Sequence, residues 1–239
     1  MGATVVFIPA LNEEESLLTV LDELAEELPG TDVVVVDDGS TDRTAEVARA
    51  GGAAVISFGE HRGLREGVAA GYRYAHEHGY AYAGRVDADG QHPVEELRRL
   101  LELVQAGACD VAVGSRFAIG DGYEASRYEA SSARRFGTAI LRRAMGAVLG
   151  RPFHDATSGM YVVNGRAMPI LAKPYESGSP EVESLLRLRE AGLRVAEIPV
   201  HMRERASGES HLHGRRAVEL VFTVAGTLLL YGLWRRRRA

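Results

Sequence analysis

The chain has 239 residues, of which 46% are hydrophobic and 26% charged, and its formal net charge at neutral pH is -5. This apolar fraction excludes an intrinsically disordered protein, and 27 Gly and 8 Pro exclude a collagen-like or low-complexity chain. The single cysteine, Cys109, allows neither an internal disulfide nor a thiolate metal cluster, which is typical of a reducing compartment.

Short Val-rich apolar runs alternate with helical patterns over the first 115 residues. Strands are expected at 4–8, 33–37, 53–58, 82–87 and 110–115, and helices at 17–28, 44–50, 68–78 and 94–104. This alternation predicts an α/β fold with a mostly parallel, Rossmann-like sheet that is flanked by helices on both faces.

The second half of the chain departs from this rhythm. Residues 117–133 are rich in Gly, Ser and mixed charge, which favours a long loop of the kind that closes over an active site. A basic helix is expected at 134–150, a strand at 159–164, a helix at 180–191 and a strand at 194–200.

The end of the chain, residues 217–238, combines an apolar run with four terminal arginines. The uncharged stretch from Leu220 to Trp234 is ~22 Å long as a helix, which is shorter than the roughly 30 Å hydrocarbon core of a bilayer. An amphipathic helix lying on an anionic membrane surface fits this pattern. A helix packed on a partner protein and a true membrane span remain alternatives.

The two halves of the chain also differ in charge. Residues 1–110 carry 21 acidic residues against 8 Arg, whereas residues 111–239 carry 12 acidic residues against 20 Lys and Arg. An acidic half suits a bound cation, and a basic half suits a phosphate or an anionic membrane. A chance distribution of solvated surface charge accounts for the asymmetry equally well.

The motif VDADGQHP places Asp87 and Asp89 at the end of a predicted strand, with Gln91 just beyond them. In open α/β sheets, ligands bind at the carboxyl ends of the strands. Two carboxylates and an amide oxygen are suitable ligands for Mg²⁺ or Mn²⁺, with further positions left for substrate phosphates. The simpler alternative is an Asx turn.

The motif VVVVDDGSTD places Asp37 and Asp38 at another strand end, where a carboxylate could accept a hydrogen bond from a ribose hydroxyl or a nucleobase N–H. A phosphatase of the Asp-x-Asp-Gly-Thr type would need its nucleophile at position 36, which is Val36. A dehydrogenase is excluded because no predicted strand is followed by Gly-x-Gly-x-x-Gly. The motif IPALNEEE, taken alone, indicates a capped helix N-terminus.

The motifs PALNEEES, VVVVDDGSTD, GLREGVAAGYRYA, RVDADGQHP, VGSRF, DATSGM and GLRVAEIPVHMRERASGES occur in this order over about residues 4–211. The ordered set resembles family 2 glycosyltransferases of the GT-A fold. It is most similar to the branch of dolichyl-phosphate mannose synthase and bacterial polyprenyl-phosphate sugar transferases. The stretches SSARRFGTA and GESHLH depart from the pattern that is common in that branch.

The resemblance implies a role for each matching residue. The nucleotide-sugar site would comprise Pro9, Ala10, Glu13, Asp37, Asp38 and Asp87. The metal ligands would be Asp87, Asp89 and Gln91. The acceptor phosphate would be bound by Arg116, Arg134, Arg135 and Ser158, and the catalytic set would be Asp89, Asp155 and Arg205.

The resemblance also implies a GT-A domain over residues 1–211, with a nucleotide-sugar and metal half (1–115) and an acceptor half (116–211), before a basic amphipathic helix (212–239). The implied reaction is inverting, metal-dependent transfer of mannose or glucose from a GDP- or UDP-hexose to polyprenyl phosphate. We expect the enzyme to lie peripherally on the cytoplasmic face of the membrane, with no nucleic-acid partner.

Two other functions remain open. One is transfer to a soluble hydroxyl acceptor, such as a saccharide or a natural product. The other is a catalytically silent subunit that binds a membrane-protein partner. Because a phosphate monoester, with a second pKa of about 6, is already largely a dianion at neutral pH, we expect Asp155 to position a lipid-phosphate acceptor or a cation. It would act as a general base only for a hydroxyl acceptor.

Overall fold

The computed structural model describes residues 3–118, 120, 146, 150 and 152–203. Most of the predicted loop at 117–133 and of the predicted helix at 134–150 lies outside these residues. The tail at 217–238 and the predicted domain boundary after residue 211 also lie outside them, as do Arg134, Arg135 and Arg205. No helix in the described part of the chain is both long and apolar enough to cross a bilayer.

Within the described residues, seven strands form one sheet in the order β3-β2-β1-β4-β6-β5-β7. The strands are β1 (Thr4–Ala10), β2 (Asp32–Asp37), β3 (Ala54–Ser57), β4 (Tyr82–Arg85), β5 (Val111–Ser115), β6 (Tyr161–Asn164) and β7 (Val195–Pro199). Strand β6 runs antiparallel to both of its neighbours, β4 and β5, whereas every other pairing is parallel. The predicted, mostly parallel sheet is thus confirmed.

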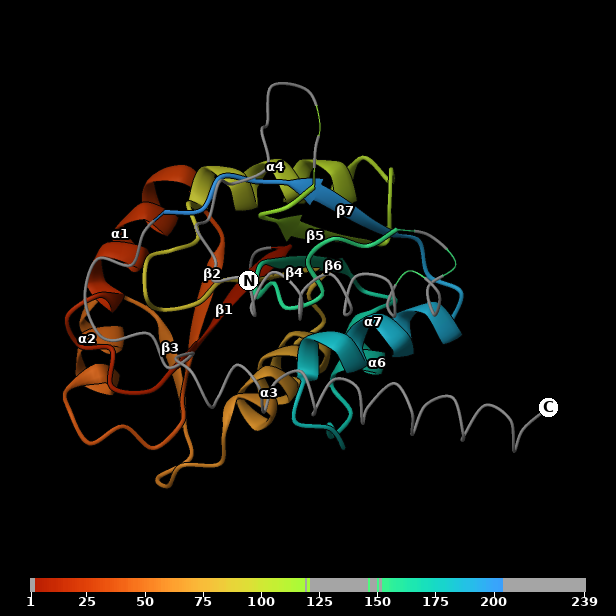
Figure 1. Ribbon diagram of the computed structural model, residues 1–239. Helices are drawn as coiled ribbons and strands as arrows, with labels where there is room; N and C mark the ends of the chain where they lie inside the picture. The colour runs from red at the N-terminus through yellow and green to blue at the C-terminus, as the bar shows by residue number, and fades with distance from the viewer. Residues whose placement is uncertain (1–2, 119, 121–145, 147–149, 151, 204–239) are drawn as a thin grey trace, which may run out of the picture.

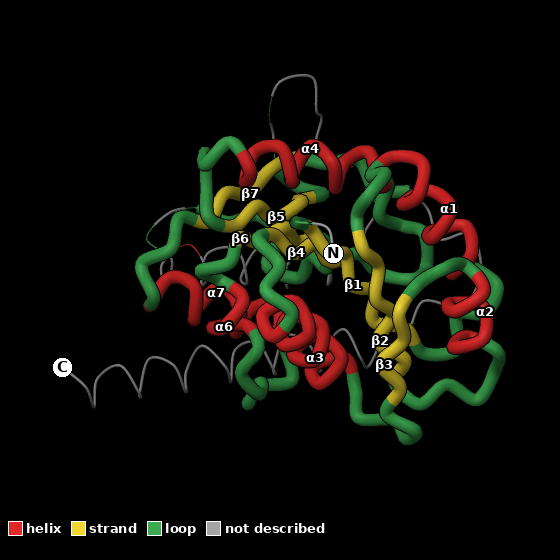
Figure 2. The backbone as a smooth tube through the Cα atoms, turned by 180° about the vertical axis from the view of Figure 1, so that it is seen from behind, coloured by secondary structure: helices red, strands yellow, loops and turns green. Residues whose placement is uncertain are grey.

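Helices cover both faces of this sheet (Figure 1 and Figure 2). They are α1 (Leu17–Glu27), α2 (Thr44–Ala50), α3 (Leu64–Glu77), α4 (Val94–Gln105), α6 (Met168–Leu171) and α7 (Pro180–Glu190). Helices α1, α2 and α4 lie on one face, and α3, α6 and α7 lie on the other. Every helix predicted within the described residues is found, and α3 begins four residues before its predicted start.

The core consists of two apolar layers, one on each face of the sheet. Because successive side chains of a strand point to opposite faces, Phe7 packs beneath α3, whereas Ile8 packs beneath α1 and α4. Gly71 lets α3 approach the sheet closely, since an added Cβ would lie only 2.2 Å from the Phe7 ring. The packed layers fix the strand ends from which the polar loops begin.

Candidate active site at the carboxyl edge of the sheet

The carboxyl ends of β1 and β2 meet in register, with Ala10 beside Asp37. Asp37 is 3% exposed, and its carboxylate accepts hydrogen bonds from the Ser40 backbone N–H (2.9 Å) and the Ser57 hydroxyl (2.7 Å). These bonds close the turn after β2 and tie it to β3. In this structure, therefore, the Asp37 carboxylate shapes the strand end that carries Asp38.

The Asp38 carboxylate holds the connection between β3 and α3. Its oxygens accept the backbone N–H groups of Arg62 (2.6 Å) and Gly63 (2.9 Å), and Oδ2 lies 2.9 Å from Nδ1 of His61. Gly39, at φ +76°, lies so close to this connection that an added Cβ would meet the Glu60 carbonyl carbon at 2.4 Å. Asp38 thus ties residues 61–63 to the end of β2, a link that the motif alone did not indicate.

The connection after β1 is bonded to the one after β2. Asn12, at φ +55°, accepts the Thr41 N–H with its side-chain oxygen (2.8 Å) and donates its own N–H to Ser40 Oγ (3.0 Å). The Glu13 N–H donates to Thr44 Oγ1 (2.9 Å), and its carboxylate accepts the Ser16 hydroxyl (2.7 Å). Hydrogen bonds therefore join the two connections to one another next to Pro9 and Ala10.

The turn after β4 carries the Asp-x-Asp motif. The Asp87 N–H donates to Nδ1 of His92 (3.0 Å), which assigns the proton of the neutral ring to Nε2, 3.8 Å from Asp87 Oδ2. Asp89 is 8% exposed and accepts the Gln91 N–H (3.1 Å), as an Asx turn does. The Gln91 carbonyl accepts the N–H of Arg203, two residues before Arg205.

Electrostatics keep the Asp87 carboxylate ionised. Burial raises the pKa of Asp87, but His92 and Arg85, with a smaller contribution from Arg116, lower it by more. The pKa of Asp87 therefore lies below its usual value. For His92, burial lowers the pKa more than the Asp87 and Asp89 carboxylates raise it. The motif thus presents an ionised Asp87 carboxylate beside His92.

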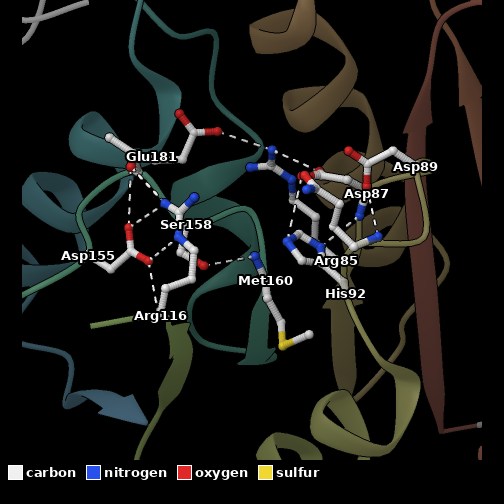
Figure 3. A network of polar contacts seen from close by, with 11 residues as sticks. Arg85, Asp87, Asp89, His92, Arg116, Asp155, Ser158, Met160 and Glu181 are labelled. Atoms are coloured by element: carbon white, nitrogen blue, oxygen red, sulfur yellow. Dashed lines mark hydrogen bonds and ion pairs between the residues drawn. The ribbon is translucent and has the colours of Figure 1, made fainter. Parts of the chain in front are cut away.

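Arg116 and Asp155 form a bidentate pair on the other side of the site (Figure 3). Arg116 Nε lies 2.7 Å from Asp155 Oδ2 and its Nη2 lies 2.7 Å from Oδ1, while the Arg116 N–H donates to Oδ2 at 3.1 Å. The Thr157 hydroxyl donates to Oδ1 at 3.2 Å. These bonds use all of the roughly four lone-pair positions of the carboxylate, whose side chain is 1% exposed.

The connection from Asp155 to Met160 joins this pair to the Asp-x-Asp motif. Ser158 is 1% exposed, and its Oγ accepts the Met160 N–H (3.2 Å). The next residue, Gly159, passes so close to Asp87 that an added Cβ would lie 2.6 Å from Oδ2. The candidate donor and acceptor groups therefore lie side by side around this connection (Figure 3).

The profile of the family described as glycosyl transferase family 2 matches residues 5–163, about two thirds of the chain. The chain belongs to glycosyltransferase family 2.

Two relatives match this glycosyltransferase along most of its length. The undecaprenyl-phosphate mannosyltransferase of Micrococcus luteus is 33% identical over 228 residues, which cover 91% of this chain and 90% of the relative. The polyprenol monophosphomannose synthase of Mycolicibacterium smegmatis is 30% identical over 231 residues, which cover 93% of this chain and 85% of the relative.

Solved structures match the fold of this glycosyltransferase. Glucosyl-3-phosphoglycerate synthase from Mycobacterium tuberculosis, in complex with Mn²⁺, uridine-diphosphate-glucose and phosphoglyceric acid, superposes with a TM-score of 0.67. It is 24% identical in sequence, and the match covers 95% of this chain and 79% of the other. The predicted GT-A fold is thereby confirmed.

The oxygen atoms of the Asp-x-Asp motif are of the kind that a divalent cation binds. In the described part of the chain, no group of three or more His, Cys, Asp or Glu side chains is placed to hold a metal ion. Mg²⁺, however, is commonly bound by one or two carboxylates, with phosphates and water completing its coordination. Asp87 is 37% exposed, so its carboxylate is accessible to such a complex. The chemistry of the Asp87 and Asp89 carboxylates, which lie two residues apart at the end of β4, therefore fits a divalent cation.

Two charged residues that the motifs did not single out organise this site. Glu197 on β7 accepts the N–H groups of His154 (2.8 Å) and Asp155 (2.7 Å), and His154 Nδ1 lies 3.0 Å from it. Arg85 at the end of β4 lies between Asp87 and Glu181. Both residues stand inside apolar strand runs, where a charge is buried only if it is paired. That placement is the sequence signal that could have identified them.

We predict that Glu197→Ala lowers the free energy of unfolding by about 3 kcal/mol, because it leaves two backbone N–H groups and His154 without their carboxylate acceptor. Activity should fall with it, since the turn that carries Asp155 is released. Urea denaturation measures the first effect. Glu190→Ala, at an exposed position on α7, is the control and should leave stability unchanged; equal stabilities for the two variants would contradict the anchoring role.

We predict that Gly159→Ala lowers kcat/KM about a hundredfold, because the new methyl group must displace the Asp87 carboxylate and a misplacement of about 1 Å costs that much. Gly165→Ala is the matched control, since its added Cβ would meet only the Ala81 carbonyl oxygen at an ordinary 3.7 Å. Steady-state kinetics of both variants test this. Equal rates for the two would show that the contact with Asp87 is irrelevant to turnover.

Proposed function

We propose that this glycosyltransferase transfers a hexose, mannose or glucose, from a nucleotide diphosphate sugar to polyprenyl phosphate with inversion at the anomeric carbon. The observation that carries the proposal is the position of the Arg116–Asp155 pair next to Asp87, around the connection that contains Gly159. This places a cationic group beside a candidate diphosphate site. The names of the two relatives, which specify polyprenyl-phosphate mannosyl transfer, support this acceptor class.

The donor side of the proposed site follows the three strand ends. The nucleoside would bind at the ends of β1 and β2, where Asp38 holds its bonded loop. The residues proposed for this site are Pro9, Ala10, Glu13, Asp37 and Asp38. Asp87, Asp89 and Gln91 would hold Mg²⁺ or Mn²⁺ on the diphosphate. The bound cation would offset the negative charge of the departing nucleoside diphosphate.

On the acceptor side, the protein has to orient an anion more than it has to remove a proton. A phosphate monoester has a second pKa of about 6, so most of it is a dianion at neutral pH. Asp155 already accepts four hydrogen bonds and holds the Arg116 fork in one orientation. We assign Arg116, whose side chain is 35% exposed, to the acceptor phosphate and Asp155 to its positioning. Ser158 shapes the adjoining wall.

The remaining assignments concern residues beyond those that the structure describes. Arg134, Arg135 and Arg205 would add positive charge for the acceptor phosphate, and the basic helix over 217–238 would bind an anionic membrane surface. The enzyme would then act peripherally on the cytoplasmic face of the membrane, where its water-soluble donor is present. A membrane-protein partner would bind through the same helix.

The test is to incubate the purified full-length protein with Mn²⁺ or Mg²⁺, GDP- and UDP-hexoses and a short-chain polyprenyl phosphate. Mass spectrometry should detect a lipid-linked hexose that disappears with EDTA. Donor hydrolysis without a lipid product would contradict the lipid acceptor and favour a soluble hydroxyl acceptor. No turnover of any donor would contradict the transferase proposal and favour the silent membrane-partner subunit.

A further inference from the structure

Arg85 is a buried charge directly behind the Asp-x-Asp motif. It is the last residue of β4 and pairs with Tyr161 of β6, so both side chains point to the face covered by α3, α6 and α7. Arg85 is 3% exposed, and its Nε has no hydrogen-bond partner. A guanidinium in an apolar layer is costly unless carboxylates compensate for it.

Two carboxylates share this guanidinium (Figure 3). Arg85 Nη2 lies 3.1 Å from Glu181 Oε1 and 3.5 Å from Asp87 Oδ1, so Glu181 is the nearer partner. Glu181 lies in the first turn of α7, 96 residues along the chain from Arg85. Burial lowers the pKa of Arg85, but Glu181 and Asp87 raise it more, so the guanidinium stays charged. The three side chains together carry one net negative charge.

We propose that Glu181 is a positioning residue for the divalent-cation site: by pairing with Arg85, it offsets the charge that would otherwise neutralise Asp87. This inference rests on the proposed function, because it takes Asp87 as a cation ligand. Glu181 itself touches neither substrate nor cation. It acts through Arg85 and leaves Asp87 with a negative charge for a metal–diphosphate complex.

The direction of the effect follows from the charges. If Glu181 is made neutral, Arg85 and Asp87 become a neutral pair, and a cation approaching Asp87 meets an uncompensated guanidinium. If Arg85 and Glu181 are both made neutral, Asp87 keeps its full charge and the net charge of the network is unchanged. The single variant should therefore weaken cation binding, whereas the double variant should restore it.

The experiment measures Mn²⁺ binding by electron paramagnetic resonance, with the full-length protein and saturating UDP in one series and GDP in the other. Glu181→Gln should raise the Kd for Mn²⁺ about tenfold, the size expected for losing one charge at close range in a partly buried site. Glu183→Gln is the matched control, because Glu183 lies on the same helix and pairs with Arg187. Its side chain is 12% exposed, against 13% for Glu181. Its Kd should stay at the wild-type value.

The double variant Arg85→Met/Glu181→Gln separates charge compensation from a merely structural role. It should bind Mn²⁺ within about twofold of wild type. If it binds as weakly as Glu181→Gln, or if Glu181→Gln binds like wild type, the inference is overturned. If Glu181→Gln does not fold, as judged by circular dichroism, the double variant alone carries the test. If the wild-type protein itself binds no Mn²⁺ with either nucleotide, it is the proposed function that fails.

Discussion

Replacement of Asp89 by Asn is expected to lower kcat/KM about a thousandfold at fixed Mn²⁺, the upper range for loss of a group that stabilises charge in a transition state. The variant keeps the side-chain shape and an oxygen that can accept the Gln91 N–H, so the Asx turn after β4 should persist. The second oxygen becomes an NH₂ group, which cannot bind a cation. Kinetics at several Mn²⁺ concentrations and Mn²⁺ binding with UDP or GDP measure the effect.

Asp110→Asn is the control for Asp89→Asn. Asp110 is also a buried carboxylate, 3% exposed, but it lies before β5 and binds the Arg194 N–H (2.9 Å) and Arg166. Its pKa is lowered, mainly by the hydrogen bond from Arg194, so the substitution should cost stability and leave kcat/KM unchanged. An Asp89→Asn enzyme with the wild-type rate and the wild-type Mn²⁺ dependence would contradict the assignment of Asp89 to the cation.

The sequence predicted the strands well because Val-rich runs bounded by turns have few alternatives, but it did not predict the direction of β6. Strand β6 lies between β4 and β5 and runs antiparallel to both, with Tyr161 opposite Arg85 and Val113. Alternation of apolar residues is the same in either direction, so direction is set by contacts distant in sequence. Helix α6 was not predicted either, since the four residues Met168–Leu171 are too few for a helical period.

Site residues were predicted where their spacing along the chain indicates their chemistry. Residues whose role depends on partners distant in sequence were missed. Asp87 and Asp89 follow a strand end, a position that itself indicates a ligand. Arg85 and Glu197 stand inside the runs YAGRVD and RVAEIPV, which are typical of buried strands. Their partners are 96 and 42 residues away, so only the folded chain shows which group each charge meets. A charged residue within an apolar strand is nevertheless a recognisable signal.

Arg116 and Asp155 should behave as one unit in a double-mutant cycle. We expect Arg116→Gln and Asp155→Asn each to lower kcat/KM for polyprenyl phosphate about a hundredfold, with the KM for the donor unchanged. In Asp155→Asn, an NH₂ donor faces the N–H donors of Arg116, so the guanidinium loses the bidentate acceptor that orients it. The positioning role thus predicts that loss of either partner has the same consequence.

The decisive quantity is the activity of the double variant Arg116→Gln/Asp155→Asn. If Asp155 acts by holding Arg116, the double variant should be no slower than the slower single variant, because the second change removes an interaction already lost. If Asp155 were an independent general base and Arg116 an independent phosphate ligand, the two losses would multiply to about ten-thousandfold. Combining Asp155→Asn with Glu183→Gln on α7 provides the additive reference, since Glu183 pairs with Arg187 and shares no contact with Asp155.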